Sequence, residues 1–513
     1  MNINTYFSNS HWLLFLCIAI FGASCNSKDQ LPAPHIQAGT AKLSGKVTGF
    51  QLNRLEEAPT LMLYTANPVT AKTRVTKVNV SEDGQFSFEI PIECSISASA
   101  LSSNFYENTL FIYFTDGNET SIELINEGKG GGRIIQDGDC VLSYNDLNYL
   151  SPTFEKMLLH QTPNALPRYS MPMKEFIPYE MENMERKLAI TYTDSLLSPM
   201  GKQYLTNEFK LFFVHFRLFD YKFMMKLDYS SFNEKDTLLN GFSIKNPDRS
   251  YYSFLKRFDL NNPLYLYNES YSTLLQTILS NDTLNIPPIN DSPIEEWLDE
   301  VKPIMADLVG FKTGLFYDML AANAYAKQFN EKQQPLSDKQ QDNIKRFFKN
   351  KGISDVLLRK NEEIKKMDSE NRQVKTNLYE TPEVPKEELM NSIVSKHAGS
   401  VVLVDFWATW CGPCMAAIDD MRVMKKSIKG KNIVFIYMTN ESSPKKLWEA
   451  KAPTIGGEHY YLGREAWEFT LENLGFDAVP TYLIYDRNGV LKHQVTGYPG
   501  NEKMQAMLES LLK

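Results

Sequence analysis

The sequence predicts a multidomain protein in which an all-β, sandwich-like domain is followed by a mostly α-helical domain and then by a C-terminal α/β domain. Short apolar runs between turn residues predict the first domain, and apolar residues at helical spacing predict the second. A buried strand that leads directly into a helix predicts the third. A chain of 513 residues is long enough for about three domains. The expected boundaries are 1–24 for a signal peptide, 25–40 for a tether, 41–149 for the β-rich domain, 150–380 for the helical domain and 381–513 for the α/β domain.

The first 25 residues have the pattern of a secretory signal. Residues 12–21 form an apolar run that is too short to span a bilayer, and small residues follow it. The segment Gly22-Ala23-Ser24-Cys25 resembles a bacterial lipobox, in which the cysteine is lipidated and becomes the first residue of the mature chain. This resemblance implies a lipid anchor on Cys25 and a place in the bacterial cell envelope facing the periplasm. It leaves open whether the anchor lies in the inner or the outer membrane.

The region of residues 41–149 has the pattern of a small β-sandwich. Short apolar runs at 60–64, 110–114 and 121–125 predict strands, and the turn residues 81–85 predict a hairpin between two further strands. Cys94 and Cys140 both lie in this region. An extracytoplasmic setting permits a structural disulfide between them, and two separate buried thiols are an equally good interpretation.

The region of residues 150–380 has the pattern of packed helices. Further helices are expected over 315–329, 339–348 and 355–367. No catalytic cluster is visible in this region. A stripe of aromatic residues at steps of three and four predicts a face buried in the core rather than a substrate groove. The stripe consists of Phe209, Phe212, Phe213, Phe216, Phe219 and Phe223.

The pair Cys411 and Cys414 carries the chemistry of this chain. The run 401–407 is apolar and β-branched with one acid, Asp405, and is typical of a buried strand; a helical pattern begins at Met415. A strand that enters a helix through C-x-x-C predicts a redox dithiol. Cys411 would lie at the helix N-terminus, where unpaired N–H groups and the helix dipole favour a thiolate. A zinc site would need two further ligands at suitable spacing, and none is visible.

The segment VDFWATWCGPC around this pair resembles the signature of the thioredoxin superfamily, and the resemblance extends over about residues 386–513. Asp405 stands at the position of the family's buried acid. Val479 and Pro480 resemble its cis-proline loop, which implies that Pro480 is cis and lies against the dithiol. The stretch 442–474 resembles the insert of the extracytoplasmic TlpA/ResA-like branch.

The resemblance implies a role for each residue around the dithiol. Cys411 would attack a substrate disulfide, and Cys414 would resolve the mixed disulfide. The substrate would bind to a surface made of Trp410, Gly412, Pro413, Val479 and Pro480. No cofactor beyond the Cys411–Cys414 disulfide, and no metal, is expected.

Asp405 departs from the family pattern in its surroundings. Thioredoxin has a lysine near its buried acid on the strand after the active-site helix, but the corresponding run 433–438 has none. We therefore expect burial to raise the pKa of Asp405, which could then accept a proton from Cys414. A purely structural acid is the alternative.

The dipeptide between the two cysteines indicates the direction of electron flow. Gly412-Pro413 is the thioredoxin dipeptide, whereas strong oxidants of the family usually carry a histidine there. We therefore expect a reductase of disulfides in envelope proteins. The resemblance implies that a membrane thiol reductant of the DsbD/CcdA kind supplies its electrons. The alternatives are a disulfide oxidase or isomerase, or a client-binding lipoprotein with a subsidiary redox module. A net charge of −8 argues against nucleic acid as a partner.

Overall fold

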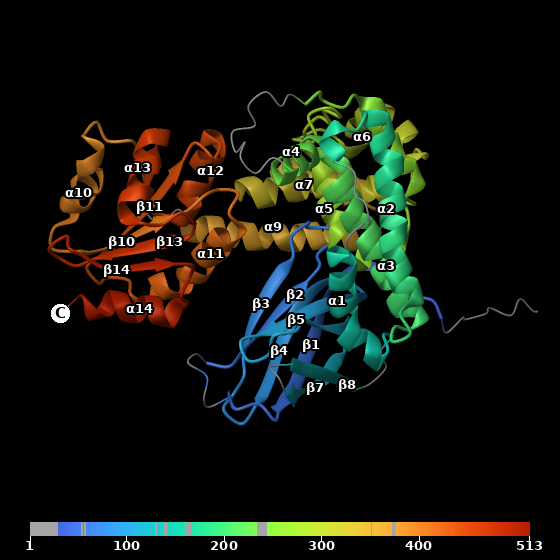
Figure 1. Cartoon of the computed structure of the whole chain (residues 1–513), viewed down its shortest axis with the longest axis horizontal. Coiled ribbons are helices and arrows are strands. Elements are labelled where there is room, and N and C mark those ends of the chain that lie inside the picture. Colours follow the sequence, from blue (N-terminus) through green and yellow to red (C-terminus); the bar gives the residue numbers. More distant parts are fainter. Residues whose placement is uncertain are drawn as a thin grey trace, which may run out of the picture.

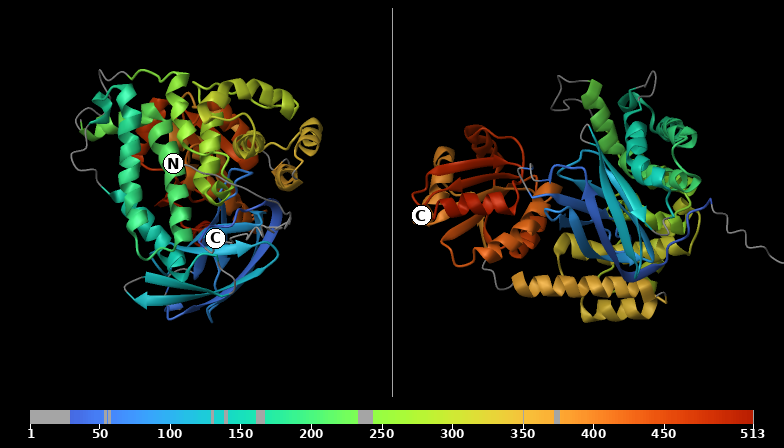
Figure 2. Two further views of the ribbon diagram at one scale, coloured as in Figure 1. Left: turned by 90° about the vertical axis from the view of Figure 1, so that its right-hand side faces the viewer. Right: turned by 90° about the horizontal axis from the view of Figure 1, so that it is seen from below.

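The computed structural model describes residues 29–512, apart from 53–54, 56–57, 129–130, 138–140, 161–166, 233–243, 350 and 372–375. A β-sandwich and a group of helices form one part of the molecule, and an α/β module lies beside them (Figure 1). The right-hand view of Figure 2 shows the α/β module to one side of the sandwich. Below, residues 29–371 are called the N-terminal unit and residues 376–512 the C-terminal module.

The sandwich consists of two four-stranded sheets, with strand orders β4-β1-β7-β8 and β3-β2-β5-β6. The long strand β1 pairs antiparallel with β4 and parallel with β7. The strands expected over 60–64, 110–114 and 121–125 are confirmed as β2, β6 and β7. The strands are β1 (Ile36–Thr48), β2 (Thr60–Thr65), β3 (Arg74–Asn79), β4 (Gln85–Cys94), β5 (Ile96–Ser103), β6 (Leu110–Thr115), β7 (Glu119–Gly128) and β8 (Gly131–Asp137).

The hairpin predicted at residues 81–85 is wrong in one respect. The turn itself forms, with a hydrogen bond from the Gly84 N–H to the Ser81 carbonyl oxygen and with Gly84 at φ +82°. The strands on either side, however, belong to different sheets, because β3 pairs with β2 and β4 pairs with β1. The turn therefore carries the chain from one layer of the sandwich to the other.

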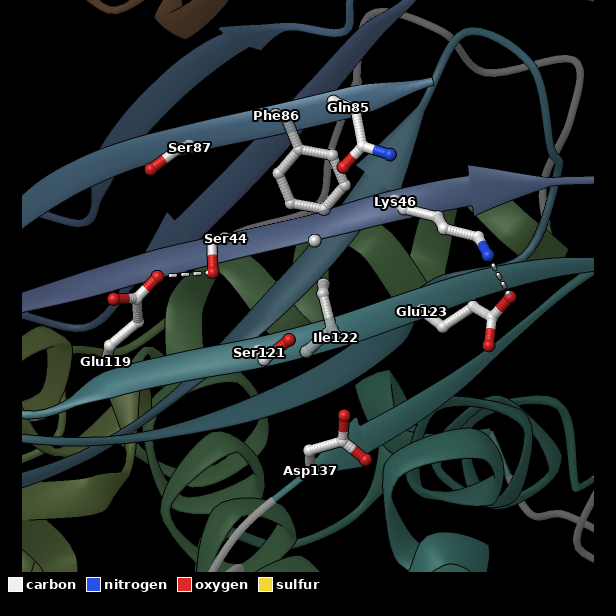
Figure 3. A pocket seen from close by; sticks show the side chains of 11 residues that line it. Ser44, Lys46, Gln85, Phe86, Ser87, Glu119, Ser121, Ile122, Glu123 and Asp137 are labelled. Atoms are coloured by element: carbon white, nitrogen blue, oxygen red, sulfur yellow. Dashed lines mark hydrogen bonds and ion pairs between the residues drawn. The ribbon is translucent and has the colours of Figure 1, made fainter. Parts of the chain in front are cut away.

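The outward face of the sheet β4-β1-β7-β8 is polar. Ser87, Ser44, Ser121 and Asp137 are register partners across its four strands, and they form a row of short side chains. Longer side chains, such as those of Lys46 and Glu123, stand beside this row (Figure 3). The Ser44 hydroxyl donates to Glu119, and Lys46 pairs with Glu123 at 3.6 Å. This is the solvated face of the sandwich, whereas the opposite face of the sheet lies in the core.

Nine α-helices follow the sandwich among the described residues. The expected helices over 315–329, 339–348 and 355–367 are confirmed as α7, α8 and α9. The helices are α1 (Tyr144–Leu159), α2 (Met173–Thr193), α3 (Pro199–Phe213), α4 (Tyr221–Phe232), α5 (Glu269–Leu279), α6 (Ile294–Val309), α7 (Leu315–Lys327), α8 (Asp338–Phe347) and α9 (Lys351–Asn371). Shorter pieces are the 3₁₀ helices η2 (Arg168–Ser170), η4 (Arg249–Arg257) and η5 (Pro263–Tyr267), and the π-helical segments η3 (Val214–Phe219) and η6 (Gln328–Lys332).

The aromatic stripe of the helical region is only partly a core face. Phe209, Phe213 and Phe219 are buried as expected, but Phe223 is 47% exposed. The π-helical segment η3 lies between the two ends of the stripe, and a π-helix has more residues per turn than an α-helix. Residues spaced by three and four therefore no longer lie on one face of the helix after η3. Phe223 on α4 points toward the surface as a result.

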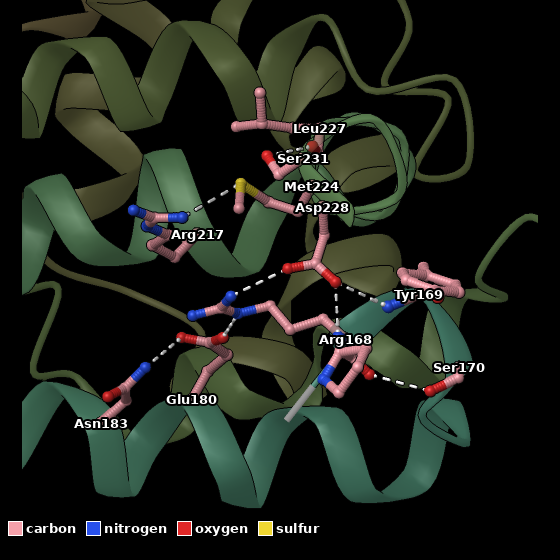
Figure 4. A network of polar contacts seen from close by, with 11 residues as sticks. Arg168, Tyr169, Ser170, Glu180, Asn183, Arg217, Met224, Leu227, Asp228 and Ser231 are labelled. Atoms are coloured by element: carbon pink, nitrogen blue, oxygen red, sulfur yellow. Dashed lines mark hydrogen bonds and ion pairs between the residues drawn. The ribbon is translucent and has the colours of Figure 1, made fainter. Parts of the chain in front are cut away.

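A buried polar network joins η2, α2 and α4 (Figure 4). The guanidinium of Arg168 donates to the carboxylate of Glu180, and it donates to Asp228 at 3.0 Å. Asp228 also accepts the backbone N–H groups of Arg168 and Tyr169. The two carboxylates pair with the cation, so the network holds η2 against both helices.

The sandwich and the helices share one continuous hydrophobic core that runs from Leu31 to Ile364. Helix α1 packs on β6 and β8, and α9 packs on β1. Gly352 allows the approach of α9, because a Cβ atom there would lie 1.8 Å from the Ile36 carbonyl oxygen. Arg359 on α9 then donates to the carbonyl oxygens of Gly39 and Ile92. The β-rich and helical regions thus form a single packed body.

The C-terminal module has a six-stranded mixed sheet with the order β14-β13-β10-β11-β12-β9. Separate cores lie on its two faces, one under α11, α12 and α14 and the other under α10 and α13. The sheet begins at Thr376, upstream of the proline-containing stretch 381–385. The elements are β9 (Thr376–Glu380), η7 (Lys386–Glu388), α10 (Leu389–Val394), η8 (Ser395–His397), β10 (Val401–Phe406), α11 (Gly412–Ser427), β11 (Ile433–Asn440), α12 (Lys445–Ile455), β12 (Gly457–Leu462), α13 (Arg464–Leu474), β13 (Thr481–Tyr485), β14 (Leu491–Thr496) and α14 (Asn501–Ser510).

The disulfide between Cys94 and Cys140, one of the two alternatives, finds no support in the described residues. Cys94 is a buried free thiol at the end of β4, and Cys140 lies outside the described residues. The structure therefore favours the interpretation of separate thiols. The predicted signal peptide and Cys25 also lie outside the described residues. Within the part of the chain that is described, no helix is long and apolar enough to cross a bilayer.

Candidate dithiol active site

Cys411 and Cys414 form a disulfide at the start of α11, with their Cα atoms 5.2 Å apart. Cys411 is the N-cap of the helix, and its sulfur accepts the backbone N–H of Cys414 at 3.1 Å. Pro413 lies in the first turn, where a missing N–H removes no helical hydrogen bond. When the disulfide is reduced, the same N–H and the helix dipole favour a thiolate on Cys411.

The strand before the pair explains why the chain turns here. All six residues of β10 are buried, so this strand is the centre of the sheet. The next residues form a tight turn, in which the Cys411 N–H donates to the Ala408 carbonyl oxygen at 3.1 Å and the Thr409 N–H donates to the Ser443 hydroxyl at 3.0 Å. The dithiol therefore sits where a rigid strand ends and a helix begins.

Of the predicted substrate-binding residues, Val479 lies against the sulfur of Cys411, and Trp410, Gly412 and Pro413 are neighbours of Cys411 in the chain. The Val479–Pro480 peptide bond is cis, which is the conformation that the resemblance to thioredoxin implies. The Val479 carbonyl oxygen lies 3.6 Å from the Cys411 sulfur. Gly412 and Pro413 are exposed, and the indole of Trp410 is 64% exposed and donates to the Ser442 hydroxyl. Because Cys411 itself is only 4% exposed, a substrate would have to approach it across these residues.

Asp405 lies on the same side of the sheet as Cys414. Side chains alternate along a strand, so Asp405 follows Val401 and Leu403 toward the core that contains Cys414. The residue is fully buried, and neither carboxylate oxygen has a hydrogen-bond partner among the described residues. Burial raises the pKa of Asp405 to about 8, against a smaller lowering by Lys425. A carboxyl with this pKa can exchange a proton near neutral pH.

A lysine nevertheless acts on Asp405 from another element. The strand β11 carries none, as the sequence showed, but α11, which covers the face of the sheet on which Asp405 lies, supplies Lys425. The Lys425 ammonium donates to the Ile455 carbonyl oxygen at 3.2 Å and lies 4.8 Å from the ring centre of Tyr437. Burial lowers the pKa of Lys425 to about 7, and Asp405 counteracts this effect.

A signal for Lys425 was present in the sequence. Cys414, Ile418, Met421 and Lys425 recur at steps of four, three and four, which places them on one face of α11. The first three are buried in the module core, so the fourth must point inward as well. Lys425 lies on the active-site helix and not on the strand after it, where thioredoxin has its lysine.

Comparison with known proteins agrees with this geometry. The family model of the thioredoxin-like domain matches residues 390–512. Over 119 residues the chain is 30% identical to the thiol-disulfide oxidoreductase ResA of Geobacillus kaustophilus, covering 23% of this chain and 67% of the relative. The chain belongs to the thioredoxin-like family of thiol-disulfide oxidoreductases.

Other relatives match a similar share of the chain. A thioredoxin of Chlorobaculum thiosulfatiphilum is 29% identical over 100 residues, covering 20% of this chain and 69% of the relative. The crystal structure of a thiol:disulfide interchange protein of the thioredoxin family from Chlorobium tepidum is 20% identical. It covers 23% of this chain and 84% of that protein, with a TM-score of 0.21.

The chemistry of the site follows from its family and geometry. The protein is a thiol-disulfide oxidoreductase, and its Cys411 and Cys414 form a disulfide in the matched domain. Cys411 occupies the helix N-terminus, the position suited to the attacking thiolate. Cys414 is 1% exposed, so it can react with Cys411 but is shielded from a bulky substrate.

Proposed function

We propose that this protein is a lipid-anchored reductase that faces the periplasm and reduces disulfides in proteins of the cell envelope. The observation that carries the proposal is the placement of Cys411, at the N-cap of α11 and beside a cis-proline, with Gly412-Pro413 between the two cysteines. The apolar segment and lipobox-like cysteine at the start of the sequence support the anchor on Cys25.

The proposed reaction is a pair of thiol–disulfide exchanges. The Cys411 thiolate attacks one sulfur of the client disulfide, which forms a mixed disulfide and releases the first client thiolate. The Cys414 sulfur then attacks Cys411, which releases the second client thiolate and leaves the Cys411–Cys414 disulfide. Asp405 takes the proton of the Cys414 thiol in this second step. Two electrons pass to the client, and a membrane dithiol of the DsbD/CcdA kind restores the reduced pair.

The reduction potential tests the direction of this reaction. The full chain, purified in detergent, is equilibrated with glutathione buffers, and the Cys411–Cys414 couple is followed by alkylation and mass spectrometry. We expect a value near −250 mV or lower, since thioredoxin lies at about −270 mV and the oxidant DsbA at about −120 mV. A potential above about −150 mV would instead assign an oxidase or isomerase. A chain carrying Cys411→Ser and Cys414→Ser controls for Cys94 and Cys140.

Cell fractionation tests the anchor separately. Cys25→Ala should release the protein from the membrane fraction, because the cysteine would no longer be lipidated. Ser24→Thr, which retains the cysteine, serves as the matched control. Continued membrane association of the Cys25→Ala chain would rule out the lipid anchor without affecting the redox assignment.

A further inference from the structure

The start of the described chain is held against the helices of the N-terminal unit. Leu31 is buried, and its backbone N–H donates to the side-chain oxygen of Gln203 on α3 at 2.9 Å. The hydroxyl of Tyr267 on η5 donates to the carbonyl oxygen of Pro32 at 2.9 Å. Ile36 then begins β1. These contacts fix the point at which the preceding residues leave the packed unit.

The short stretch between Cys25 and Leu31 limits how far a lipid anchor can lie from this point. Six residue steps separate Cys25 from Leu31. A fully extended chain advances about 3.3–3.6 Å per residue, so a lipidated Cys25 lies within about 22 Å of Leu31. A bilayer that holds this anchor must therefore pass close to the start of α3.

The C-terminal module lies at the other end of the molecule. Gly352, in the first turn of α9, packs against the carbonyl oxygen of Ile36. The 21 residues of α9 lead from there to the module, and at 1.5 Å per residue this helix is about 30 Å long. Figure 1 shows the blue start of the chain and the module at opposite ends of the longest axis, and the right-hand view of Figure 2 agrees. The anchor therefore holds the N-terminal unit, and not the module, next to the membrane.

Two large side chains with apolar surface are exposed beside the point where the chain starts. Tyr192, near the end of α2, is 49% exposed, and Leu196, in the turn between α2 and α3, is 41% exposed. Lys202, in the first turn of α3, donates to the Tyr192 carbonyl oxygen at 3.0 Å. The next residue along α3 is Gln203, which binds Leu31. The exposed side chains and the start of the chain thus share one turn of α3.

Helix α1 adds a third side chain to this surface. The Thr153 hydroxyl on α1 donates to the carboxylate of Asp194 at 2.7 Å, so this side of α1 faces the turn between α2 and α3. Asp194 also accepts the backbone N–H of Leu196 at 2.8 Å, which holds the turn in place. Tyr149, one helical turn before Thr153, is 37% exposed. Tyr149, Tyr192 and Leu196 are called the anchor-side patch below.

The chemistry of the anchor-side patch suits a bilayer surface. Tyrosine combines an apolar ring with a polar hydroxyl and is enriched where membranes meet water. Lys156 and Lys202 flank the patch on α1 and α3, and lysine stems can lie along apolar surface while their ammonium groups stay in water. A stable protein interface buries about 800 Å² on each partner, far more than three partly exposed side chains offer. A bilayer needs no such area, because the anchor already holds it beside the patch.

We propose that the anchor-side patch rests on the lipid surface of the membrane that holds Cys25. The inference rests on the proposed lipid anchor and adds an orientation to it. The two tyrosine rings and Leu196 enter the interfacial layer of the bilayer, and the N-terminal unit stands between the membrane and the dithiol module. Cys411 is thereby presented away from the bilayer, and clients meet it in the periplasmic space.

Quenching by brominated lipids tests this contact. The full chain, purified from membranes, is reconstituted into vesicles of phosphatidylcholine and phosphatidylglycerol whose acyl chains carry bromine near the headgroup or carry none. Leu196→Trp adds an indole to the patch, and subtraction of the emission of the original chain gives its signal. Bromine should quench most of this added emission, because the indole lies in the interfacial layer. Val490→Trp, at a 50% exposed position of the module, is the matched control and should keep its emission.

A second variant and a binding measurement make every outcome decisive. Tyr192→Trp replaces Leu196→Trp as the reporter if the latter does not fold, and cosedimentation with vesicles is measured in the same samples. Patch variants that cosediment but keep their full emission would overturn the inference, as would equal quenching of Val490→Trp. Emission of Leu196→Trp that changes with protein concentration in detergent, but not with bromine, would assign the patch to a contact between two copies and also overturn it. Failure of the original chain to cosediment would instead defeat the proposed lipid anchor.

Discussion

The N-terminal unit and the C-terminal module of this chain are organised in different ways. In the described residues of the unit, a β-sandwich and nine α-helices share one core, so that strands and helices far apart in sequence stabilise each other. In the module, one sheet carries two smaller cores, one on each face. The two parts contact each other through α12, which packs on η6 and α9. The thioredoxin-like match, residues 390–512, lies entirely in the module.

The cysteines of the two parts show how position decides reactivity. Cys94 is buried in the unit, and desolvation raises its pKa well above that of a free thiol. Such a thiol is a poor nucleophile at neutral pH. Cys411 is nearly as buried, but it caps a helix and accepts an N–H on its sulfur. A helix N-terminus thus makes a buried sulfur reactive, whereas the sheet of the sandwich keeps one inert.

The largest effect expected from this contrast concerns the two thiols. Cys411→Ser should reduce exchange with a small disulfide to the uncatalysed background, because the attacking sulfur is lost. Cys94→Ser should leave the rate unchanged, and comparison of the two chains in the same assay gives the contrast directly. A Cys411→Ser chain that still turned over would remove Cys411 as the nucleophile.

The next effect concerns the two core systems. Leu43→Ala, in the fully buried part of β1, should destabilise the unit by about 2–5 kcal/mol through the cavity it creates. Because the core is shared, hydrogen exchange should become faster in β1 and in α6 together, while peptides of the module stay protected. Leu403→Ala on β10 is the matched control and should show the opposite pattern. If α6 kept its protection in Leu43→Ala, the unit would consist of two independent domains.

A smaller effect is a stability profile that belongs to the module alone. The pKa of Asp405 is raised to about 8 in the folded state, so folding favours the protonated acid. This preference stabilises the folded module fully below pH 4, and the stabilisation is lost as the pH rises through about 8. Burial lowers the pKa of Lys425 to about 7. The free energy of unfolding therefore rises again as the pH increases from about 7 toward the ordinary pKa of a lysine. We expect a stability minimum near pH 7–8, about 2–4 kcal/mol below the value at pH 4.5.

Urea unfolding of the module, followed by hydrogen exchange, measures this minimum. Asp405→Asn should remove the fall between pH 4.5 and 8 and make the module more stable at pH 8. The N-terminal unit supplies the internal reference in the same samples. A flat profile for the module of the original chain would contradict the raised pKa of Asp405.

The sequence predicted the residues of the dithiol site but not the lysine that packs beneath them. Local patterns were sufficient for the strand, turn and helix around Cys411 and for the buried acid at Asp405. Lys425 was missed because its approach to Asp405 depends on which face of α11 packs on the sheet. Its spacing from Cys414 carried that information, but only together with the knowledge that this face is buried.

The wrong predictions about the fold also depended on tertiary packing, which local sequence patterns do not show. The residues 81–85 do form a turn, but no local pattern shows which sheet each flanking strand will join. The periodicity of the aromatic stripe predicted burial for Phe223, and the π-helical segment η3 shifted the phase before it. The shared core of the sandwich and the helices is a property of tertiary packing, which segment-by-segment reading of a sequence does not contain.

The first strand of the module affects how the chain can be divided. The proline-containing stretch after Glu380 looks like a natural boundary, yet β9 lies before it and is the edge strand of the sheet, paired in parallel with β12. Tyr379 stacks on Tyr460 of β12 at 4.8 Å, and Glu380 forms an ion pair with Lys445. A fragment that starts at residue 381 would expose the hydrogen-bonding edge of β12 together with the ring of Tyr460. Such fragments should associate with one another edge to edge, and a fragment that begins at Thr376 should stay monomeric.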